Sequence, residues 1–410
     1  MRKKVVVIGG GAAGMIAAGR AASLGSDTLL LEKNNILGKK LLITGKGRCN
    51  ITNSGNIREL IENIPGNGKF LYSAFNYFSN KDLIKLLESL GLKVKYERGK
   101  RVFPITDRSK DVVNTLISYL KKNNVKVHTN KKAEKIKISN GKILGVETSQ
   151  GEFFKTDSII IATGGMSYPA TGSTGDGYRM AKELGHTIIP LKPSLVPLTT
   201  KENWVKNVQG LTLKNVKVSA FRNNHKISEE FGEMLFTHFG VSGPVILTMS
   251  RDIVQGISDK IKISIDLKPA LNESKLDTRL QRDFKEFDKR MFKNSLTKLL
   301  PKSLIPIVIK LSDIPPNKKI NQITKQERLK LIRILKGLEL NINGYRPIEE
   351  AIVTSGGVSV KEINPKTMES KLIKGLFFAG EVIDVDGLTG GFNLQAAFST
   401  GFVAGSFSSN

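Results

Sequence analysis

The apolar positions at the start of the chain follow the pattern of a strand, a helix and a second strand. Val5–Ile8 is a β-branched run with no polar position, which is typical of a parallel strand buried on both faces. Small and apolar residues recur at helical spacing over Ala12–Leu24, and Thr28–Leu31 is a second apolar run. This order predicts a βαβ unit, and therefore an α/β fold.

The alternation of helices and strands continues to about residue 190. Amphipathic helices are predicted over Asp82–Leu90 and Asp111–Lys122, with a Lys/Arg-rich turn region, Lys93–Arg101, between them. Asn140-Gly141 is a strong hairpin signal, since both residues tolerate a positive φ. Further short strands are predicted at Val125–His128, Lys135–Ser139, Ile143–Thr148 and Ser158–Ala162.

The pattern changes near Pro190, where prolines punctuate the chain and short alternating strands such as Val216–Phe221 and Ile261–Asp266 appear. Residues 271–336 are helical and basic, and buried-strand character returns after Ala351 with Leu376–Ala379. A helix, Asn393–Ala404, follows a Gly-rich turn. We predict an α/β domain from residues 1–190 and 351–410, a β-rich insert at 191–270 that returns at 337–350, and a nested helical insert at 271–336.

A glycine-rich motif marks the turn of the βαβ unit. Gly9, Gly11 and Gly14 follow the first strand and open the helix, and Glu32 ends the second strand. In dinucleotide-binding folds the first glycine permits the tight turn, the second lets backbone approach a pyrophosphate, and the third permits close helix–strand packing. The helix N-terminus supplies amides to the phosphates, and Glu32 would accept the ribose hydroxyls.

Two later segments favour FAD over NAD. Ile159–Gly165 is a buried strand that ends in an Ala-Thr-Gly turn, and Gly375–Glu381 is a strand that delivers an acidic residue to the cofactor. No second GxGxxG follows a strand, so NAD(P)H is expected to bind only transiently at the flavin face. Amides around Phe392–Leu394 are predicted to stabilise the negative charge of reduced flavin. The alternative is an ordinary N-capped helix.

Composition narrows the chemistry. The 410 residues include one cysteine, Cys49, and four histidines, so disulfides, Cys-pair redox centres and iron–sulfur clusters are excluded and no metal site is expected. The net charge of +27 favours a polyanionic partner or a membrane surface, and a lysine-rich proteome is the alternative explanation. No apolar run approaches the length of a bilayer span, so a cytoplasmic protein without stable membrane association is expected.

Four further segments are distinctive: Gly38–Asn53, Gly172–Tyr178, Phe236–Pro244 and Thr367–Lys371. With these segments the chain resembles the BaiN-like, or aminoacetone oxidase, family of bacterial NAD(P)/FAD-dependent oxidoreductases. The resemblance implies a Rossmann-like FAD domain interrupted by a β-barrel-like insert that carries a helical insert. Similar proteins have been assigned to amine oxidation, to reduction of steroid enones, and to reduction of uridine to dihydrouridine in ribosomal RNA, so the family leaves the substrate open.

The motifs and the resemblance together assign the cofactor-binding residues. They lie in the glycine-rich turn, the ribose-binding strand, the loop after it, the Ala-Thr-Gly turn and the C-terminal loop. Lys46 and Arg48 could offset the charge of the pyrophosphate or of a substrate. The predicted set is Gly9, Gly11, Ala12, Ala13, Gly14, Glu32, Lys33, Lys40, Thr44, Gly45, Arg48, Asn50, Ala133, Thr163, Gly164, Gly165, Gly380, Glu381, Asp386, Gly391, Phe392, Asn393 and Leu394.

Two side chains are candidates for the catalytic proton donor. Reduction of a carbon–carbon double bond needs a hydride at one carbon and a proton at its neighbour. Cys49 could donate as a neutral thiol, although nearby basic residues would favour the thiolate; the alternative is a small buried residue that packs against the ring. His238 matches the family segment in the insert that would cover the flavin, and the alternative is a satisfied core histidine.

Three aromatic residues are candidates for substrate contact. Tyr168 and Tyr178 flank the Gly172–Gly177 turn and could stack on a substrate or hydrogen-bond to it. Phe239 or Tyr168 is a candidate to hold an extruded base. Asp176 is expected to cap a helix that starts at Tyr178.

The basic segments favour RNA as the substrate. Lys93–Arg101, Lys131–Lys142 and the helical insert are rich in lysine and arginine, and phosphate contacts supply most of the affinity for RNA. The first hypothesis is therefore NAD(P)H-dependent reduction of a uridine C5–C6 bond in 23S ribosomal RNA. The second is a small-molecule flavoenzyme, either an amine oxidase or an enone reductase, and the third is a flavin-containing RNA-binding protein without turnover. The oligomeric state, the nicotinamide preference and the particular uridine stay open.

Overall fold

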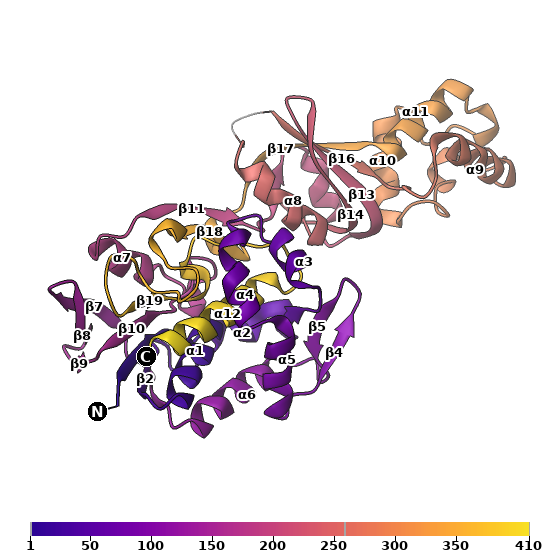
Figure 1. Cartoon of the computed structure of the whole chain (residues 1–410). Coiled ribbons are helices and arrows are strands. Elements are labelled where there is room, and N and C mark those ends of the chain that lie inside the picture. Colours follow the sequence, from indigo (N-terminus) through magenta and orange to yellow (C-terminus); the bar gives the residue numbers. More distant parts are fainter. Residues whose placement is uncertain (1, 258–259, 410) are drawn as a thin grey trace. The chain divides into compact units, whose positions relative to one another are not determined.

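The computed structural model describes residues 2–257 and 260–409 of the chain. The chain forms two compact units, one from Met1–Ser194 and Ile348–Asn410 and the other from Leu195–Pro347 (Figure 1). The divisions lie a few residues from the positions 190 and 351 that the proline spacing and the return of buried strands indicate. Each unit is described by itself below.

The first unit is built on a five-stranded parallel sheet with the strand order β19-β10-β1-β2-β6. The central strands β1 and β10 consist mainly of aliphatic residues, which are buried on both faces. The strand nearest the C-terminus, β19, pairs with β10 at one edge, so the segment after the second unit completes the sheet. The bounds are β1 Lys4–Ile8, β2 Asp27–Leu31, β6 Lys126–His128, β10 Ser158–Ile161 and β19 Leu376–Phe378.

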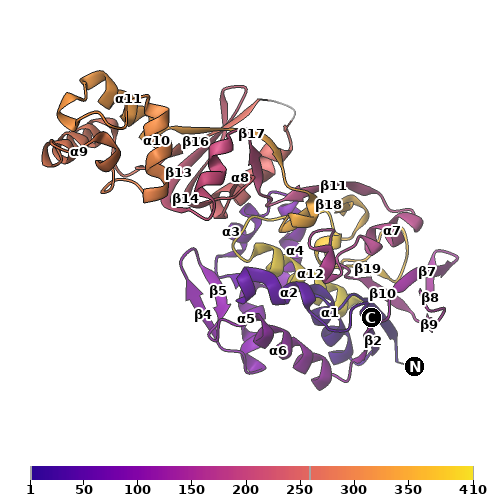
Figure 2. The same ribbon diagram turned by 180° about the vertical axis from the view of Figure 1, so that it is seen from behind.

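Helices α1 (Ala12–Ser23) and α12 (Phe392–Phe407) lie side by side (Figures 1 and 2). Two glycines of α12 permit the close contact: a Cβ atom at Gly401 or at Gly405 would lie 2.4 Å from the carbonyl oxygen of Ala13 or Ala17, respectively. Gly401 lies against Ala13, and Gly405, four residues later, lies against Ala17, also four residues later, so the two helices run parallel. From this register α12 begins about eight residues, or ~12 Å, before α1 along their shared direction.

The remaining elements of the first unit surround this sheet. The prediction of a turn region at Lys93–Arg101 is corrected: strand β4 lies within it, and β5 starts at Arg101. The two strands pair because Val94, Val102 and Phe103 need a partner for their apolar faces. The predicted hairpin at Asn140-Gly141 is confirmed, since both residues have positive φ. The bounds are α2 Lys39–Ile43, α3 Ile57–Glu62, α4 Tyr72–Tyr77, α5 Asn80–Ser89, α6 Ser109–Lys122, α7 Asp176–Glu183, β3 Thr52–Asn53, β4 Val94–Glu97, β5 Arg101–Pro104, β7 Ala133–Ser139, β8 Lys142–Thr148, β9 Phe153–Lys155, β11 Ile188–Ser194 and β18 Val353–Val358.

The second unit is a closed barrel of six strands in the order β12-β15-β14-β13-β16-β17. Three α-helices and three short 3-10 helices are inserted between β16 and β17, which confirms the prediction of a Rossmann-like domain with a barrel insert that carries a helical insert. Sequence analysis did not find β14, because its exposed glutamates break the apolar alternation. The bounds are β12 Leu198–Thr200, β13 Thr212–Arg222, β14 His225–Phe236, β15 Gly240–Ser242, β16 Ile261–Asp266, β17 Leu338–Tyr345, α8 Pro244–Val254, α9 Glu273–Glu286, α10 Ile305–Ser312 and α11 Lys325–Lys336.

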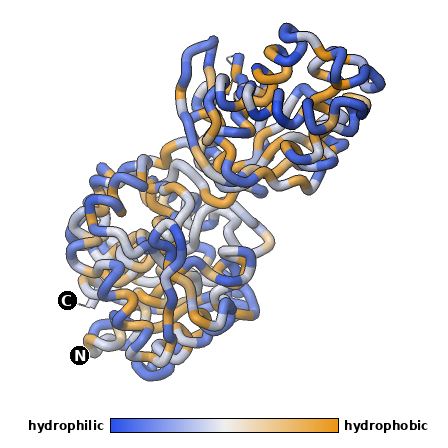
Figure 3. The backbone as a smooth tube through the Cα atoms, turned by 90° about the vertical axis from the view of Figure 1, so that its right-hand side faces the viewer, coloured by the Kyte–Doolittle hydropathy of each residue, from blue (hydrophilic) through white to orange (hydrophobic). Residues whose placement is uncertain are grey.

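Hydrophobic and hydrophilic stretches alternate along the described backbone (Figure 3). Within the described ranges, no helix is both long enough and apolar enough to cross a membrane.

Candidate active site

The glycine-rich turn between β1 and α1 is tightly packed except at one position. Gly9 has a φ of 104°, and a Cβ atom there would lie 2.5 Å from the carbonyl oxygen of Ala162. A Cβ at Gly14 would lie 1.8 Å from the carbonyl oxygen of Gly9. A Cβ at Gly11, by contrast, would meet no atom within 4 Å. Gly9 and Gly14 therefore shape the turn, whereas Gly11 faces open space where a pyrophosphate would fit.

Two helix N-termini are available for a ligand at this side of the sheet. Neither α1, which follows Gly11, nor α12, which follows Gly391, has a side-chain cap, so the alternative of an ordinary capped helix at Phe392 is wrong. The first amides of a helix have no intrahelical acceptor and carry partial positive charge. The offset of ~12 Å between the two parallel helices suits an extended dinucleotide, whose pyrophosphate α1 would hold and whose flavin α12 would hold.

Among the described residues, five buried side-chain oxygen atoms lack a hydrogen-bond partner, and two of the five belong to residues predicted to bind the cofactor: Oδ1 of Asn50 and Oγ1 of Thr163. Buried polar atoms in native proteins are almost always paired with protein, water or a ligand. The two orphaned oxygens, the open face of Gly11 and the uncapped helices together fit FAD.

Glu32 lies against the glycine-rich turn. Its carboxylate accepts hydrogen bonds from the backbone amide of Gly10 and from the backbone and side-chain nitrogens of Asn34, each at 2.7 Å. The neighbouring Lys33 donates to Asp176 at 2.6 Å. Helix α7 starts at Asp176 after an uncapped Gly175, so the expectation that Asp176 caps a helix starting at Tyr178 is wrong. The Asp176 carboxylate instead holds the lysine that follows Glu32.

Glu381 is the centre of a hydrogen-bond network. Its carboxylate accepts from Lys40 Nζ at 2.7 Å and from the Thr354 amide at 2.9 Å. Lys40 also donates to Ser167 at 2.6 Å, and the Tyr178 hydroxyl donates to the Glu381 carbonyl at 3.2 Å. Tyr178 is buried, so its visible contact is with this turn and its predicted role in substrate contact stays a prediction. The network joins α2 to the turns that follow β10 and β19.

The loop between α2 and β3 has an unusual backbone. Gly45, Lys46, Gly47 and Cys49 all have positive φ, which is costly for the two residues that carry a side chain. Residues with a side chain rarely adopt a positive φ by themselves, so contacts with the surrounding structure must hold the loop in this conformation. Strain of this kind is typical of segments that approach a ligand.

Arg48 holds that loop in place. Its guanidinium contacts Glu97 at 2.5 Å and Asp107 at 2.6 Å, and it lies 4.2 Å from the centre of the Phe103 ring. Hydrogen bonds from Lys95 and Arg48 keep the pKa of Asp107 below its usual value. The expectation that Arg48 offsets the charge of a pyrophosphate is therefore corrected: in this structure two carboxylates already neutralise it.

Cys49 lies in the core with 0% of its surface exposed. Burial raises the pKa of its thiol to about 11, so the expectation that nearby basic residues favour the thiolate is wrong. A sulfur with no exposed surface cannot touch a substrate unless the loop opens. Cys49 therefore loses support as the proton donor, and a packing role fits its position.

We expect the Cys49 thiol to react slowly with a disulfide reagent in the folded protein. The pKa of the thiol rises from 9.0 in the unfolded chain to about 11 in the folded protein, so folding favours the neutral thiol. The stability that this preference contributes to the fold is fully present below pH 9 and is lost as the pH rises through 11. At pH 8 the thiolate fraction alone predicts labelling about 100-fold slower than in the unfolded chain. Rapid labelling of the native protein would show that the loop opens and would restore Cys49 as a candidate donor.

The other predicted cofactor residues shape the surrounding turns. The buried Asp386 accepts from Ser194 at 2.9 Å and from Ser355 at 3.1 Å, and Asn393 Oδ1 accepts from the Gly387 amide at 2.8 Å. The remainder occupy turns, helix starts and strand ends of the first unit: Ala12, Ala13, Thr44, Ala133, Gly164, Gly165, Gly380, Phe392 and Leu394.

His238 and Phe239 belong to the second unit, on the turn that joins β14 to β15. The His238 side chain is exposed, so the alternative of a satisfied core histidine is wrong. Its ring lies edge-on to Phe239 with 4.9 Å between the ring centres, and the Arg346 guanidinium lies 4.8 Å from the centre of the Phe239 ring. An imidazole, an aromatic ring and a guanidinium therefore share one end of the barrel.

Sequence reasoning missed Ser167, Thr354 and Arg346. Ser167 stands three residues after the Ala162-Thr163-Gly164 turn, and this position could have suggested it. Thr354 and Arg346 reach their partners only through the fold, and no local signal marks them.

Comparison with known proteins places this geometry in a family. The chain matches the family model described as HI0933-like protein Rossmann domain over residues 3–407. It is 32% identical to the 3-dehydro-bile acid delta(4,6)-reductase of Clostridium scindens, over 96% of this chain and 95% of that protein. It is 31% identical to the ribosomal RNA dihydrouridine synthase of Haemophilus influenzae, over 95% of this chain and 94% of that protein.

Among solved structures, the fold is similar to the open conformation of a flavocytochrome c3 fumarate reductase. The TM-score is 0.55 at 18% identity, over 99% of this chain and 78% of that one. This similarity concerns the fold alone. The family model and the relatives confirm the resemblance to the BaiN-like flavoproteins, and the chain therefore belongs to the HI0933-like family of FAD-dependent oxidoreductases.

Proposed function

We propose that this protein reduces the C5–C6 double bond of a uridine in large-subunit ribosomal RNA, with FAD as its cofactor and NAD(P)H as a transient electron donor. The observation that favours RNA over a small molecule is the net charge of +27. The relative named as a ribosomal RNA dihydrouridine synthase supports the same substrate. An RNA substrate would place the activity in the cytoplasm.

The names of the two relatives describe reactions of one kind. The C5–C6 bond of uracil and the ring double bonds of an oxidised bile acid are electron-poor double bonds conjugated to a carbonyl. When bound and reduced by NAD(P)H, the FAD would supply the hydride for such a bond. The protein must then stabilise negative charge near the flavin and deliver a proton to the neighbouring carbon. The uncapped amides at the start of α12 suit the first task.

His238 is our candidate for the second task. Its imidazole is exposed, whereas the Cys49 thiol is buried and holds its proton with a raised pKa. Phe239, with Arg346 over its ring, is the candidate surface for stacking an extruded base, as is Tyr168 in the first unit. Cys49 stays as the second candidate donor.

A small-molecule enone reductase is the second candidate function. The 32% identity to a protein named as a bile acid reductase favours it. Such an enzyme would turn over a soluble enone and would need no basic surface. A flavin-containing RNA-binding protein without turnover is the third possibility, and it predicts RNA binding with no product.

Dihydrouridine mapping in 23S ribosomal RNA separates these functions. We expect the modification to be absent from a deletion strain and to return with the wild-type protein or with Cys49→Ala. His238→Gln should lower the initial rate by roughly 100-fold, because a positioned acid contributes about 10²–10⁴. The control is FAD content, which should match the wild type. Unchanged dihydrouridine in the deletion strain would refute the RNA function, and NAD(P)H oxidation driven by a keto-enone steroid would support the second candidate.

A further inference from the structure

The helical insert contains a groove with an apolar floor. The segment after α9 runs beside the segment after α10: the Phe292 amide donates to the Lys318 carbonyl at 2.9 Å, and the Lys293 amide donates to the Pro316 carbonyl at 3.0 Å. Together with α10 these segments border an open groove of about 550 Å³. The lining residues are mostly aliphatic or proline: Ile305, Pro306, Ile309, Ile314, Pro315 and Pro316, with Lys293, Lys310 and Asp313. We call this the insert groove.

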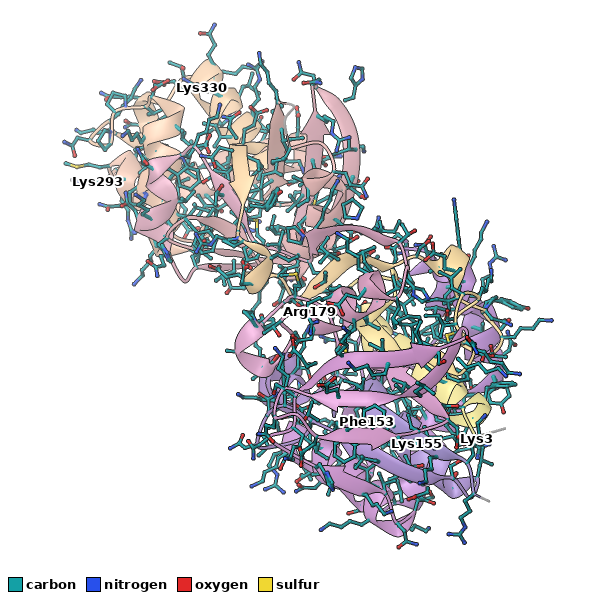
Figure 4. The ribbon with its side chains drawn as sticks, turned by 90° about the vertical axis from the view of Figure 1, so that its left-hand side faces the viewer. Lys3, Phe153, Lys155, Arg179, Lys293 and Lys330 are labelled. Atoms are coloured by element: carbon teal, nitrogen blue, oxygen red, sulfur yellow. The ribbon has the colours of Figure 1, made fainter. Side chains whose placement is uncertain are left out.

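Five cations stand on the segments that form the insert groove: Lys289, Arg290, Lys293, Lys310 and Lys319. All five are exposed, and none forms an ion pair with a carboxylate in the part of the chain that the structure describes. Asp313, the acidic residue of the lining, is already paired with Lys330. Lys293 and Lys330 both project from the insert (Figure 4). The groove therefore presents positive charge without an internal partner.

The contacts of these cations leave their charge available. Lys293 Nζ donates to a neutral amide oxygen, that of Asn317, at 3.0 Å. Arg290 lies over the Phe287 ring, 4.5 Å from its centre, where the other face of the guanidinium can receive a second planar group. Several other cations of the insert are neutralised by carboxylates, for example Arg328 by Asp277 at 2.6 Å.

We propose that the insert groove binds a single-stranded or looped segment of RNA. Phosphates would contact the five cations, and a splayed base would lie on the apolar floor or stack on Arg290. RNA fits better than an acidic peptide because positive charge continues across the insert: residues 271–336 contain 17 Lys and Arg against 7 Asp and Glu. The inference rests on the proposed function and names a docking surface for its substrate on the second unit.

The test compares two variants of the full-length, FAD-loaded protein that lose the same number of charges. The groove variant carries Lys289→Gln, Arg290→Gln, Lys293→Gln, Lys310→Gln and Lys319→Gln. The control variant carries Gln at five exposed lysines of α5 and α6: Lys81, Lys85, Lys110, Lys121 and Lys122. The probe is protein-free 23S ribosomal RNA from the deletion strain. Binding is measured over a range of salt concentrations, and dihydrouridine formation is measured as a function of RNA concentration.

We expect the groove variant to bind this RNA at least tenfold more weakly at physiological salt and to show a shallower salt dependence, because each lost phosphate contact lowers the slope by about 0.7–0.9. Its KM for RNA should rise while its FAD content and kcat stay near those of the wild type. The control variant should change RNA affinity by less than the groove variant does.

Other results would overturn either the docking surface or the proposed function. Equal losses of affinity in the two variants, or no loss in either, would overturn the inference while leaving the proposed function intact. Weaker binding to ribosomal particles with unchanged binding to protein-free RNA would overturn it in favour of a protein partner. If the wild type makes no dihydrouridine but the groove variant alone loses RNA affinity, the proposed function fails and the docking surface stands.

Discussion

Gly11→Ala is expected to yield a stable apoprotein that no longer retains FAD. Gly11 has a φ of −83° and a ψ of −166°, which alanine adopts readily, and no atom lies within 4 Å of the new Cβ. The methyl group would stand in the open space before the α1 N-terminus, where backbone and pyrophosphate need close contact. We expect FAD affinity to fall roughly 100-fold, or about 3 kcal/mol. Bound flavin is measured by absorbance, and stability by urea unfolding of the apoprotein.

Gly14→Ala is the matched control, since the same methyl group is added three residues further on. There the new Cβ would lie 1.8 Å from the carbonyl oxygen of Gly9, which is backbone and cannot move aside. We expect the apoprotein itself to lose about 3–5 kcal/mol of unfolding free energy. Equal destabilisation by the two substitutions would contradict the distinct roles assigned to Gly11 and Gly14.

Gly401→Ala should destabilise the protein, although helix propensity predicts the opposite. Alanine is favoured over glycine inside a helix by about 1 kcal/mol. At Gly401, however, a Cβ would lie 2.4 Å from the carbonyl oxygen of Ala13, so α12 would have to move away from α1. We expect a net loss of about 2–4 kcal/mol and weaker FAD binding, because both helix N-termini would be displaced.

The control for Gly401→Ala is Asn114→Ala, at an exposed position of α6. Propensity acts there without a close neighbour, so stability should rise by a few tenths of a kcal/mol. Urea unfolding of both apoproteins measures the two signs. A stabilising effect at Gly401 would mean that the two helices are not held together as described.

The parts of the fold that local pattern dictates were predictable. Val5–Ile8 is buried on both faces and contains only apolar residues, and the structure has β1 there. In Ile261–Asp266 apolar and polar residues alternate, and the structure has β16 at the predicted residues. β14 was missed because Glu229, Glu230 and Glu233 interrupt its apolar positions. Pairing across the barrel, which no short window of sequence reports, decides such a strand.

In the candidate site, too, features with a local sequence signature were predictable, whereas contacts between distant segments were not. The glycine-rich turn has a local signature, because each glycine answers a local steric need. The positive φ of Cys49 and the ion pairs of Arg48 with Glu97 and Asp107 depend on a hairpin about 50 residues away. The contact of Lys40 with Glu381 spans 341 positions of the chain. Long-range pairs of this kind follow from the topology, so sequence reasoning named the residues but not their partners.

The contact between α1 and α12 has a consequence for the order of assembly. During synthesis α1 emerges early, whereas β19 and α12 emerge only after the whole barrel and its helical insert. Until then β10 lacks its edge neighbour and α1 lacks the helix that Gly401 and Gly405 let in so closely. The second unit can complete its own core first, since domains fold as units as they leave the ribosome. With α12 holding the flavin as predicted, the cofactor can bind only to a chain that has been synthesised through α12, so bound flavin would report that this stage has been passed.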